Sequence, residues 1–245
     1  SETAYDVASL TTRSVAGIGY ALRRGGLLSK QLYSVGNSSL MIVTLFGLFV
    51  GLILVLYGAE QLPQFGMEKQ IGLAGLPIIW EFGPVFTAFI LAGRVGSAYA
   101  AEIGTMRVYD EIDSLEVMGI RPESYLVAPR LVACVLLVPC LVIYADFTAL
   151  VGGAVMAWMQ LNVPPATFFE TMFNALQFNV MWRSLLKAAI FGGIIAVTGC
   201  YKGFTTEGGA EGVGRSTTES VVHSLLAILV TDYFLSKLLM PEWRF

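Results

Sequence analysis

The sequence has little charge and few side chains that bind metals. Only 13% of its 245 residues are charged, and it contains one His and three Cys. Soluble domains carry about 25% charged residues, which argues against an ordinary soluble enzyme. The net charge of −3 provides no basic surface for nucleic acid. The three cysteines lie in apolar stretches, so we expect neither a disulfide nor a metal site.

Hydrophobic residues make up 56% of the chain, and the mean hydropathy is +0.69. A helix that crosses a bilayer needs about 20 mostly apolar residues. The sequence has five such stretches, at residues 38–58, 75–100, 130–159, 183–201 and 221–240. It therefore predicts an all-α integral membrane protein with five transmembrane helices, in one domain over residues 1–245.

The flanking charges predict how the chain crosses the membrane. Nine Lys and Arg residues flank the spans on the side of the N-terminus and four on the opposite side. Because cytoplasmic segments hold the excess of basic residues, we expect a cytoplasmic N-terminus and a C-terminus on the far side. Residues 1–28 place apolar side chains near one helical face, which predicts a helix lying at the membrane interface.

Four charged residues lie inside the far-side halves of the predicted spans. They are Glu81, Asp146, Lys187 and Asp232. Ionisable groups in a span are costly, so each is a candidate functional residue. One interpretation is a polar cavity that opens to the far side and accepts an amphiphile with a charged head. The alternative is pairing between helices, for instance of Lys187 with Asp232. Arg94 lies nearer the cytoplasmic end, where its side chain can reach the interface.

Glycine and proline are placed to shape the spans. Gly47 and Gly51 have the spacing that lets helix backbones approach closely. In the second span, the sequence Glu81-Phe82-Gly83-Pro84 predicts a loosened helix, because Pro84 cannot donate to the carbonyl four residues back.

The loop over residues 101–130 predicts a short amphipathic helix on the cytoplasmic side. Its apolar positions are Val108, Ile112, Leu115 and Met118, and its acidic positions are Asp110, Asp113 and Glu116. Gly119 and Pro122 are expected to end it. Such a helix suits docking into a groove of another protein. The alternative, a plain connecting helix on the membrane surface, fits poorly with its acidity, since that leaflet is itself negative.

Several stretches resemble one known family. They include Glu81-Phe82-Gly83-Pro84, residues 92–97 (Ala-Gly-Arg-Val-Gly-Ser), 101–106, 118–122, 129–130 and 217–224. On these residues the chain resembles the MlaE/YrbE family, the permease subunits of Mla- and Mce-type ABC transporters that move phospholipids and other lipids. One departure is Trp80, where many relatives have a basic residue.

The resemblance implies a homodimer in the bacterial inner (cytoplasmic) membrane, with its C-terminus in the periplasm. Each subunit would bind a cytoplasmic ABC ATPase through a coupling helix at about residues 107–118. A periplasmic Mce-domain hexamer would receive phospholipid, in the maintenance of outer-membrane lipid asymmetry, and a small STAS-type subunit is a further expected partner. The family positions linked to lipid correspond to Glu81, Lys187 and Asp232.

The chain lacks the Gly-x-x-x-x-Gly-Lys-Ser/Thr motif that holds nucleotide phosphates. The run Gly208–Gly214 has no such lysine, and we interpret it as a flexible cytoplasmic turn. The expected role is therefore a transporter permease and not an enzyme, with ATP and Mg²⁺ bound by the partner ATPase. Two alternatives remain open: an ion-coupled carrier of a small solute using Glu81 and Asp232, and a membrane scaffold that transports nothing.

Overall fold

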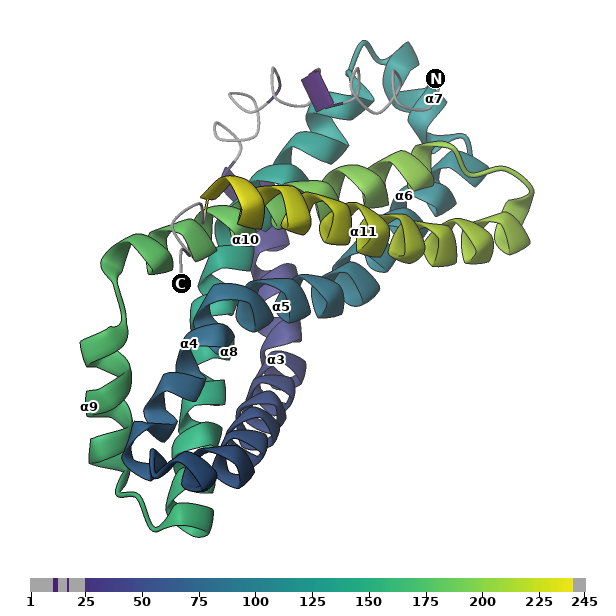
Figure 1. Cartoon of the computed structure of the whole chain (residues 1–245). Helices are drawn as coiled ribbons and strands as arrows, with labels where there is room; N and C mark the ends of the chain where they lie inside the picture. Colours follow the sequence, from purple (N-terminus) through teal and green to yellow (C-terminus); the bar gives the residue numbers. More distant parts are fainter. Residues whose placement is uncertain (1–10, 13–16, 18–24, 240–245) are drawn as a thin grey trace. The chain divides into compact units, whose positions relative to one another are not determined.

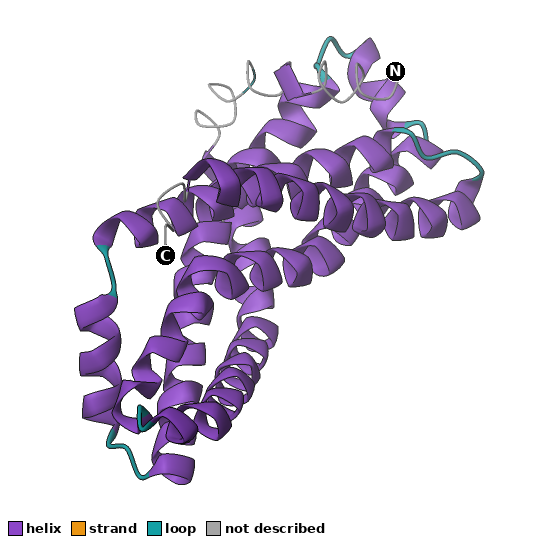
Figure 2. Cartoon of the chain, viewed as in Figure 1, coloured by secondary structure: helices purple, strands orange, loops and turns teal. Residues whose placement is uncertain are grey.

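A computed structural model describes residues 11–12, 17 and 25–239 of the chain. Within these residues the backbone is helical apart from short turns, and it contains no strand (Figure 2). The predicted interfacial helix at residues 1–28 lies almost entirely outside the described residues, so it stays a prediction.

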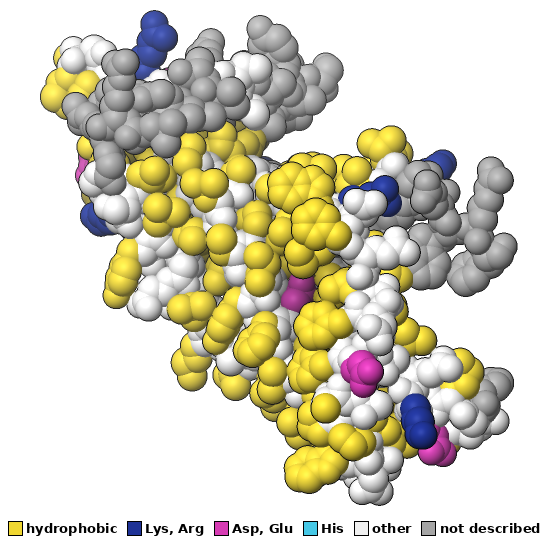
Figure 3. All heavy atoms as spheres, turned by 90° about the vertical axis from the view of Figure 1, so that its left-hand side faces the viewer, with side chains coloured by type: hydrophobic (Ala, Val, Ile, Leu, Met, Phe, Trp, Pro, Cys, Tyr) yellow, Lys and Arg dark blue, Asp and Glu magenta, His cyan; other side chains and the backbone are white. Residues whose placement is uncertain are grey.

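Five helical segments are long and apolar enough to cross a membrane. They are Gly26–Gln64, Glu68–Val108, Glu123–Leu161, Phe178–Phe204 and Gly209–Leu239. Each overlaps one predicted span and is longer, because the helical backbone continues past the apolar window into polar flanking residues. The prediction of an all-α membrane protein with five spanning helices is confirmed. Large hydrophobic side chains are exposed along these helices, and they predominate on the face in Figure 3.

The segments are built from elements that Figure 1 labels in part. The longest helices are α3 (Gly25–Gln61), α8 (Ala128–Leu161), α10 (Phe178–Phe204) and α11 (Gly209–Leu239). The second segment is composite, with η2 (Glu68–Ala74), α4 (Gly75–Pro77), η3 (Ile78–Phe82), α5 (Gly83–Leu91), η4 (Ala92–Gly96) and α6 (Ser97–Val108). The remaining elements are η1 (Leu62–Phe65), α7 (Glu111–Val117), η5 (Glu123–Val127) and α9 (Pro165–Ala175).

The chain divides into two compact units. The first takes its residues from 1–39, 88–138 and 189–245, and the second from 40–87 and 139–188. Helices α3, α8 and α10 contribute residues to both units.

Close contact between α3 and α8 organises the second unit. A Cβ atom added to Gly51 would overlap the backbone carbonyl of Ala149, and one added to Gly47 would meet the Ala145 carbonyl at 2.7 Å. Only residues without a side chain allow this approach, as the spacing of the two glycines predicts. Further along the unit, α9 packs on η2 and buries Phe168 and Met172 completely.

Small polar residues join the helices of the first unit. Helix α11 packs along α6 and η4. Ser220 Oγ donates to the carbonyl of Gly96 at 3.3 Å, and the hydroxyls of Ser224 and Thr198 lie 2.5 Å apart. Buried polar groups need such partners, so these contacts fix α11 against its neighbours.

The predicted helix at residues 107–118 is interrupted, so its bounds were wrong. Helix α6 ends at Val108, and Asp110 adopts a left-handed backbone conformation with φ of 54°. Asp tolerates this conformation better than most residues, and it breaks the helix here. Helix α7 then ends at Val117. The predicted stop at Gly119 follows it directly: φ of Gly119 is 72°, and the Ile120 N–H donates to the Leu115 carbonyl at 3.0 Å.

The prediction of a turn over Gly208–Gly214 was wrong for most of its length. Helix α11 begins at Gly209, directly after Gly208 with φ of 90°. The turn therefore occupies residues 205–208. Glycine disfavours a helix by only about 1 kcal/mol per residue, which packing of the following turns can offset.

Candidate functional site

The second spanning segment changes geometry where the sequence contains Glu81-Phe82-Gly83-Pro84. Residues Ile78–Phe82 form one turn of π-helix, and Gly83 N–H donates to the Ile78 carbonyl five residues back. Pro84 has no N–H to donate, and its ring crowds the carbonyl four residues back, so a wider turn accommodates it. The predicted loosening is confirmed. Single π-turns of this kind occur frequently at functional sites.

An ion pair joins this turn to α10. Lys187 Nζ donates to Glu81 Oε2 at 2.7 Å. The Lys187 side chain is 0% exposed, whereas that of Glu81 is 37% exposed. A buried ammonium is costly unless a carboxylate compensates it, so Glu81 neutralises Lys187 and presents the accessible edge of the pair.

The structure therefore brings together two of the four predicted site residues, Glu81 and Lys187, within the second unit. The contact has the form of the pairing between helices that the sequence left open. Asp232 lies on α11 in the first unit and is partly buried.

Asp146 lies in the second unit on α8 and forms no ion pair with the described residues. Its side chain is among the buried ones, with 9% exposure. No described residue hydrogen-bonds the Oδ1 atom, which lies against Gly83, where an added Cβ would overlap it. Asp146 also lines a cavity of about 10 Å³, close to the smallest space that holds one water molecule. Both acids thus adjoin η3: Glu81 belongs to it, and Asp146 touches the residue after it.

Three phenylalanines line the cavity beside Asp146. The rings of Phe82 and Phe86 stack with centroids 5.5 Å apart, and Phe46 meets Phe86 edge-on at 5.5 Å. This aromatic cluster was not predicted from the sequence. Phe82 and Phe86 follow Glu81 and are one helical turn apart, and this spacing could have predicted that their rings meet.

The predicted coupling residues lie at and after the end of α6. Asp110, Asp113 and Glu116 are exposed, and Val108 and Leu115 are partly buried. Ile112 is buried within the chain, so it is not available to a partner. Met118, from the predicted apolar stripe, is exposed, and so are Tyr109 and Val117, which the stripe did not include. The four predicted apolar positions thus do not form one exposed stripe, because the left-handed Asp110 separates Val108 on α6 from the other three.

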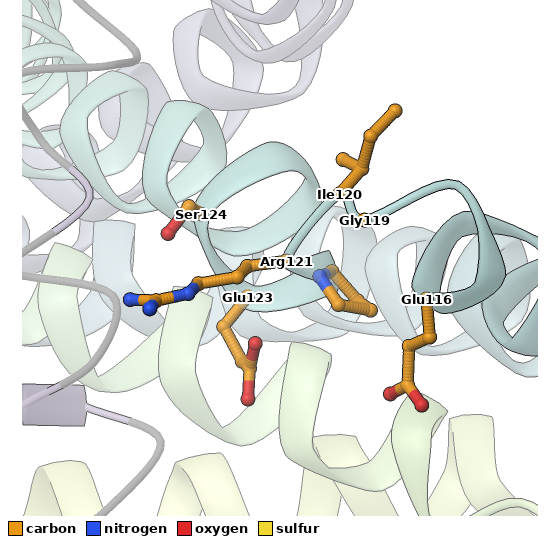
Figure 4. A pocket seen from close by; sticks show the side chains of 7 residues that line it. Glu116, Gly119, Ile120, Arg121, Glu123 and Ser124 are labelled. Atoms are coloured by element: carbon orange, nitrogen blue, oxygen red, sulfur yellow. The ribbon is translucent and has the colours of Figure 1, made fainter.

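A hollow of about 620 Å³ adjoins α7. It is lined by Glu116, Gly119, Ile120, Arg121, Pro122, Glu123 and Ser124 (Figure 4). The guanidinium of Arg121 points away from the carboxylate of Glu116 in this view. Also on α7, Asp113 pairs with Arg107 at 2.6 Å. The surface around α7 is thus acidic, with a concave flank and exposed apolar side chains beside it.

Comparison with known families gives a match over most of the chain. The family model described as Permease MlaE matches residues 28–238. The chain belongs to the MlaE permease family. This MlaE permease is therefore a multi-pass membrane protein of the ABC transporter class, and a permease of that class works with an ATPase.

Relatives of the MlaE permease agree with this assignment. A probable ABC transporter permease protein of Synechocystis sp. is 41% identical over 86% of this chain and 80% of its own length. A probable ABC transporter permease protein of Rickettsia typhi is 36% identical over 87% of this chain and 83% of its own length. The chloroplastic protein TRIGALACTOSYLDIACYLGLYCEROL 1 of Arabidopsis thaliana is 35% identical over 85% of this chain and 59% of its own length.

Proposed function

We propose that this MlaE permease moves phospholipid between the bacterial inner membrane and a periplasmic Mce-domain partner, so serving outer-membrane lipid asymmetry. The observation that carries the proposal is the pair of Glu81 with the fully buried Lys187. A lipid phosphate needs a cation inside the membrane, and Lys187 offers one. The name of the Arabidopsis relative, which refers to a galactosylated glycerolipid, gives independent support for lipid as the substrate class.

The geometry suggests how a head group would enter. Glu81 is the exposed member of the pair, so an arriving phosphate meets the carboxylate first. The phosphate then replaces Glu81 on the Lys187 ammonium, which exchanges one anion for another and never leaves the buried cation unpaired. The displaced carboxylate turns toward water or toward the amine of a zwitterionic head group. The ion pair is thus the closed state of the site.

The adjoining π-turn gives this site a place to move. Glu81 lies within η3, and Pro84 leaves the helix without its ordinary hydrogen bond there. Asp232 and Asp146 belong to the proposal as further polar groups of the lipid path, Asp146 beside the turn and Asp232 on α11.

The assembly we propose is a homodimer with a cytoplasmic ATPase dimer, a periplasmic Mce hexamer and a STAS-type subunit. The N-terminus would be cytoplasmic and the C-terminus periplasmic.

The exposed acidic residues of α7, with Val117 and Met118, support docking of the ATPase. ATP and Mg²⁺ would bind to that ATPase, and this chain would supply only conformational change. Exposed apolar residues along α3 and α11 would be covered by lipid and by the second copy.

The test is lipid-stimulated ATP hydrolysis by the complex purified with its neighbours. Phosphatidylglycerol nanodiscs should stimulate the wild-type complex, and Glu81→Gln should remove most of that stimulation. Glu170→Gln is the matched control, since Glu170 is an exposed acid of the same unit. Equal stimulation of both variants would contradict the proposal. Solute uptake by this chain alone, driven by an ion gradient, would favour the carrier.

A further inference from the structure

Arg94 is a cation inside the second spanning segment that pairs with no described carboxylate. It lies in η4, a π-turn over Ala92–Gly96. Its Nη1 atom donates to Ser39 Oγ at 2.9 Å, and no described residue accepts from its other N–H groups. A guanidinium carries five N–H donors in a planar fork, so four stay available to a ligand.

Two other cations of the first unit with largely buried side chains are neutralised by the chain itself. Arg130 pairs with Glu102 at 2.7 Å with its side chain 7% exposed. Lys202 pairs with Glu219 at 2.7 Å with its side chain 18% exposed. This unit therefore supplies a carboxylate where a cation is withdrawn from water. Arg94, which is partly buried, receives only a neutral hydroxyl.

Arg94 is held inside the segment. Glu102, the next charged residue along the helix, lies about 12 Å further on at the ordinary helical rise. Ser39 is fully buried and donates to the Val35 carbonyl at 2.7 Å, so the hydroxyl that receives Arg94 is itself fixed on α3. The guanidinium is thus tied to a neighbouring helix, α3. A charge kept at such depth calls for a partner.

The surface beside Arg94 is open. Gly93 is exposed, and a Cβ added there meets no atom within 4 Å. Arg94 is itself only partly buried, so a ligand can reach its side chain next to this open position. In a membrane segment, the anion that reaches such a surface is the phosphate of a lipid.

We propose that Arg94 binds the phosphate group of a membrane lipid, separately from the Glu81–Lys187 site. The planar guanidinium fork matches two phosphate oxygens and forms short charge-assisted hydrogen bonds with them. By the predicted topology Arg94 lies in the cytoplasmic half of the membrane, whose leaflet is rich in anionic lipids. The proposal concerns binding by this chain alone and does not depend on which substrate the transporter carries.

The test is a binding titration of the delipidated permease in detergent. The three probes are short-chain phosphatidylglycerol, the matching diacylglycerol and inorganic phosphate. Wild-type protein should bind phosphatidylglycerol, and Arg94→Gln should bind it about tenfold more weakly, the loss expected for a charge-assisted pair. Diacylglycerol should bind equally to both proteins. Arg215→Gln is the matched control, because Arg215 is a 74% exposed cation of the same unit.

Arg94→Lys separates the binding role from folding. It keeps the charge and should fold, but it loses the fork, so its affinity for phosphatidylglycerol should fall between those of wild type and Arg94→Gln. Equal affinity of all three proteins would overturn the proposal. Inorganic phosphate binding as tightly as phosphatidylglycerol would overturn the assignment to a lipid. No ATPase or transport enters these measurements, so their outcome is independent of the proposed function.

Discussion

The ammonium of Lys187 is wholly enclosed by the protein, whereas the Glu81 carboxylate that pairs with it at 2.7 Å is 37% exposed. The two partners are therefore not equivalent. Loss of Glu81 leaves a charge buried, while loss of Lys187 leaves a carboxylate that water can reach.

This asymmetry predicts unequal effects on stability. Glu81→Gln should lower the melting temperature in detergent more than Lys187→Met, because methionine fills the buried space without a charge. The double variant should be more stable than Glu81→Gln alone, with a coupling free energy of about 0.5–3 kcal/mol. Lys69→Met, at an exposed lysine of the same unit, should be neutral. Additive effects of the two site variants would show that the pair contributes nothing.

The contact of Gly83 with Asp146 predicts a second effect on stability. Gly83→Ala should destabilise the protein by about 1–3 kcal/mol, because its methyl group would occupy the place of Asp146 Oδ1. Asp146→Ala removes that oxygen, which forms no hydrogen bond with the described part of the chain, so the double variant should recover most of the loss. Thermal unfolding of the three variants measures this. If the double variant were as unstable as Gly83→Ala, the added methyl group would not be clashing with Asp146, and the prediction would be wrong.

The approach of α3 to α8 predicts that two glycines of α3 respond differently to alanine. Gly51→Ala should lower the melting temperature, because its Cβ would overlap the Ala149 carbonyl, which cannot rotate away. Gly36→Ala should be neutral or slightly stabilising, since an added Cβ there meets only Leu137 side-chain atoms, at 3.8 and 3.9 Å. Equal melting temperatures for the two variants would contradict the close helix contact.

The acidic surface of α7 predicts the strength of ATPase binding. The double variant Asp113→Lys, Glu116→Lys should copurify with several-fold less ATPase than wild type, because both carboxylates are exposed. Glu170→Lys changes charge on α9 and should leave copurification unchanged. Val117→Ser tests the exposed apolar contribution separately. If the double lysine variant copurified with as much ATPase as wild type, α7 would not be part of the ATPase interface.

Much of the fold follows from the sequence because spanning helices have strong signals. Apolar length located all five spans, and the spacing of Gly47 and Gly51 predicted a close helix contact. The Glu81-Phe82-Gly83-Pro84 motif predicted the irregular turn, because the missing N–H of Pro84 has a local consequence. These features depend on residues that are near one another in the chain.

Features that depend on distant residues could not be predicted in the same way. Depth in the membrane grouped Glu81 with Lys187, but it could not decide which of several acids lies against the ammonium. The left-handed conformation of Asp110 divides one expected helix into two, and Ile112 in the second of them is buried. The anchoring of Arg94 on Ser39 joins positions far apart in sequence, and neither residue indicates it alone.

The most direct test of the account measures phospholipid transfer by the assembled complex. Labelled phosphatidylglycerol in proteoliposomes is supplied with ATP, and its appearance on the Mce partner is followed for wild type, Lys187→Met and Lys69→Met. The account predicts that Lys187→Met slows transfer at least about tenfold, the worth of one charge-assisted contact, with the dimer and ATPase still bound, while Lys69→Met matches wild type. Phospholipid transfer by Lys187→Met at the wild-type rate would contradict the account.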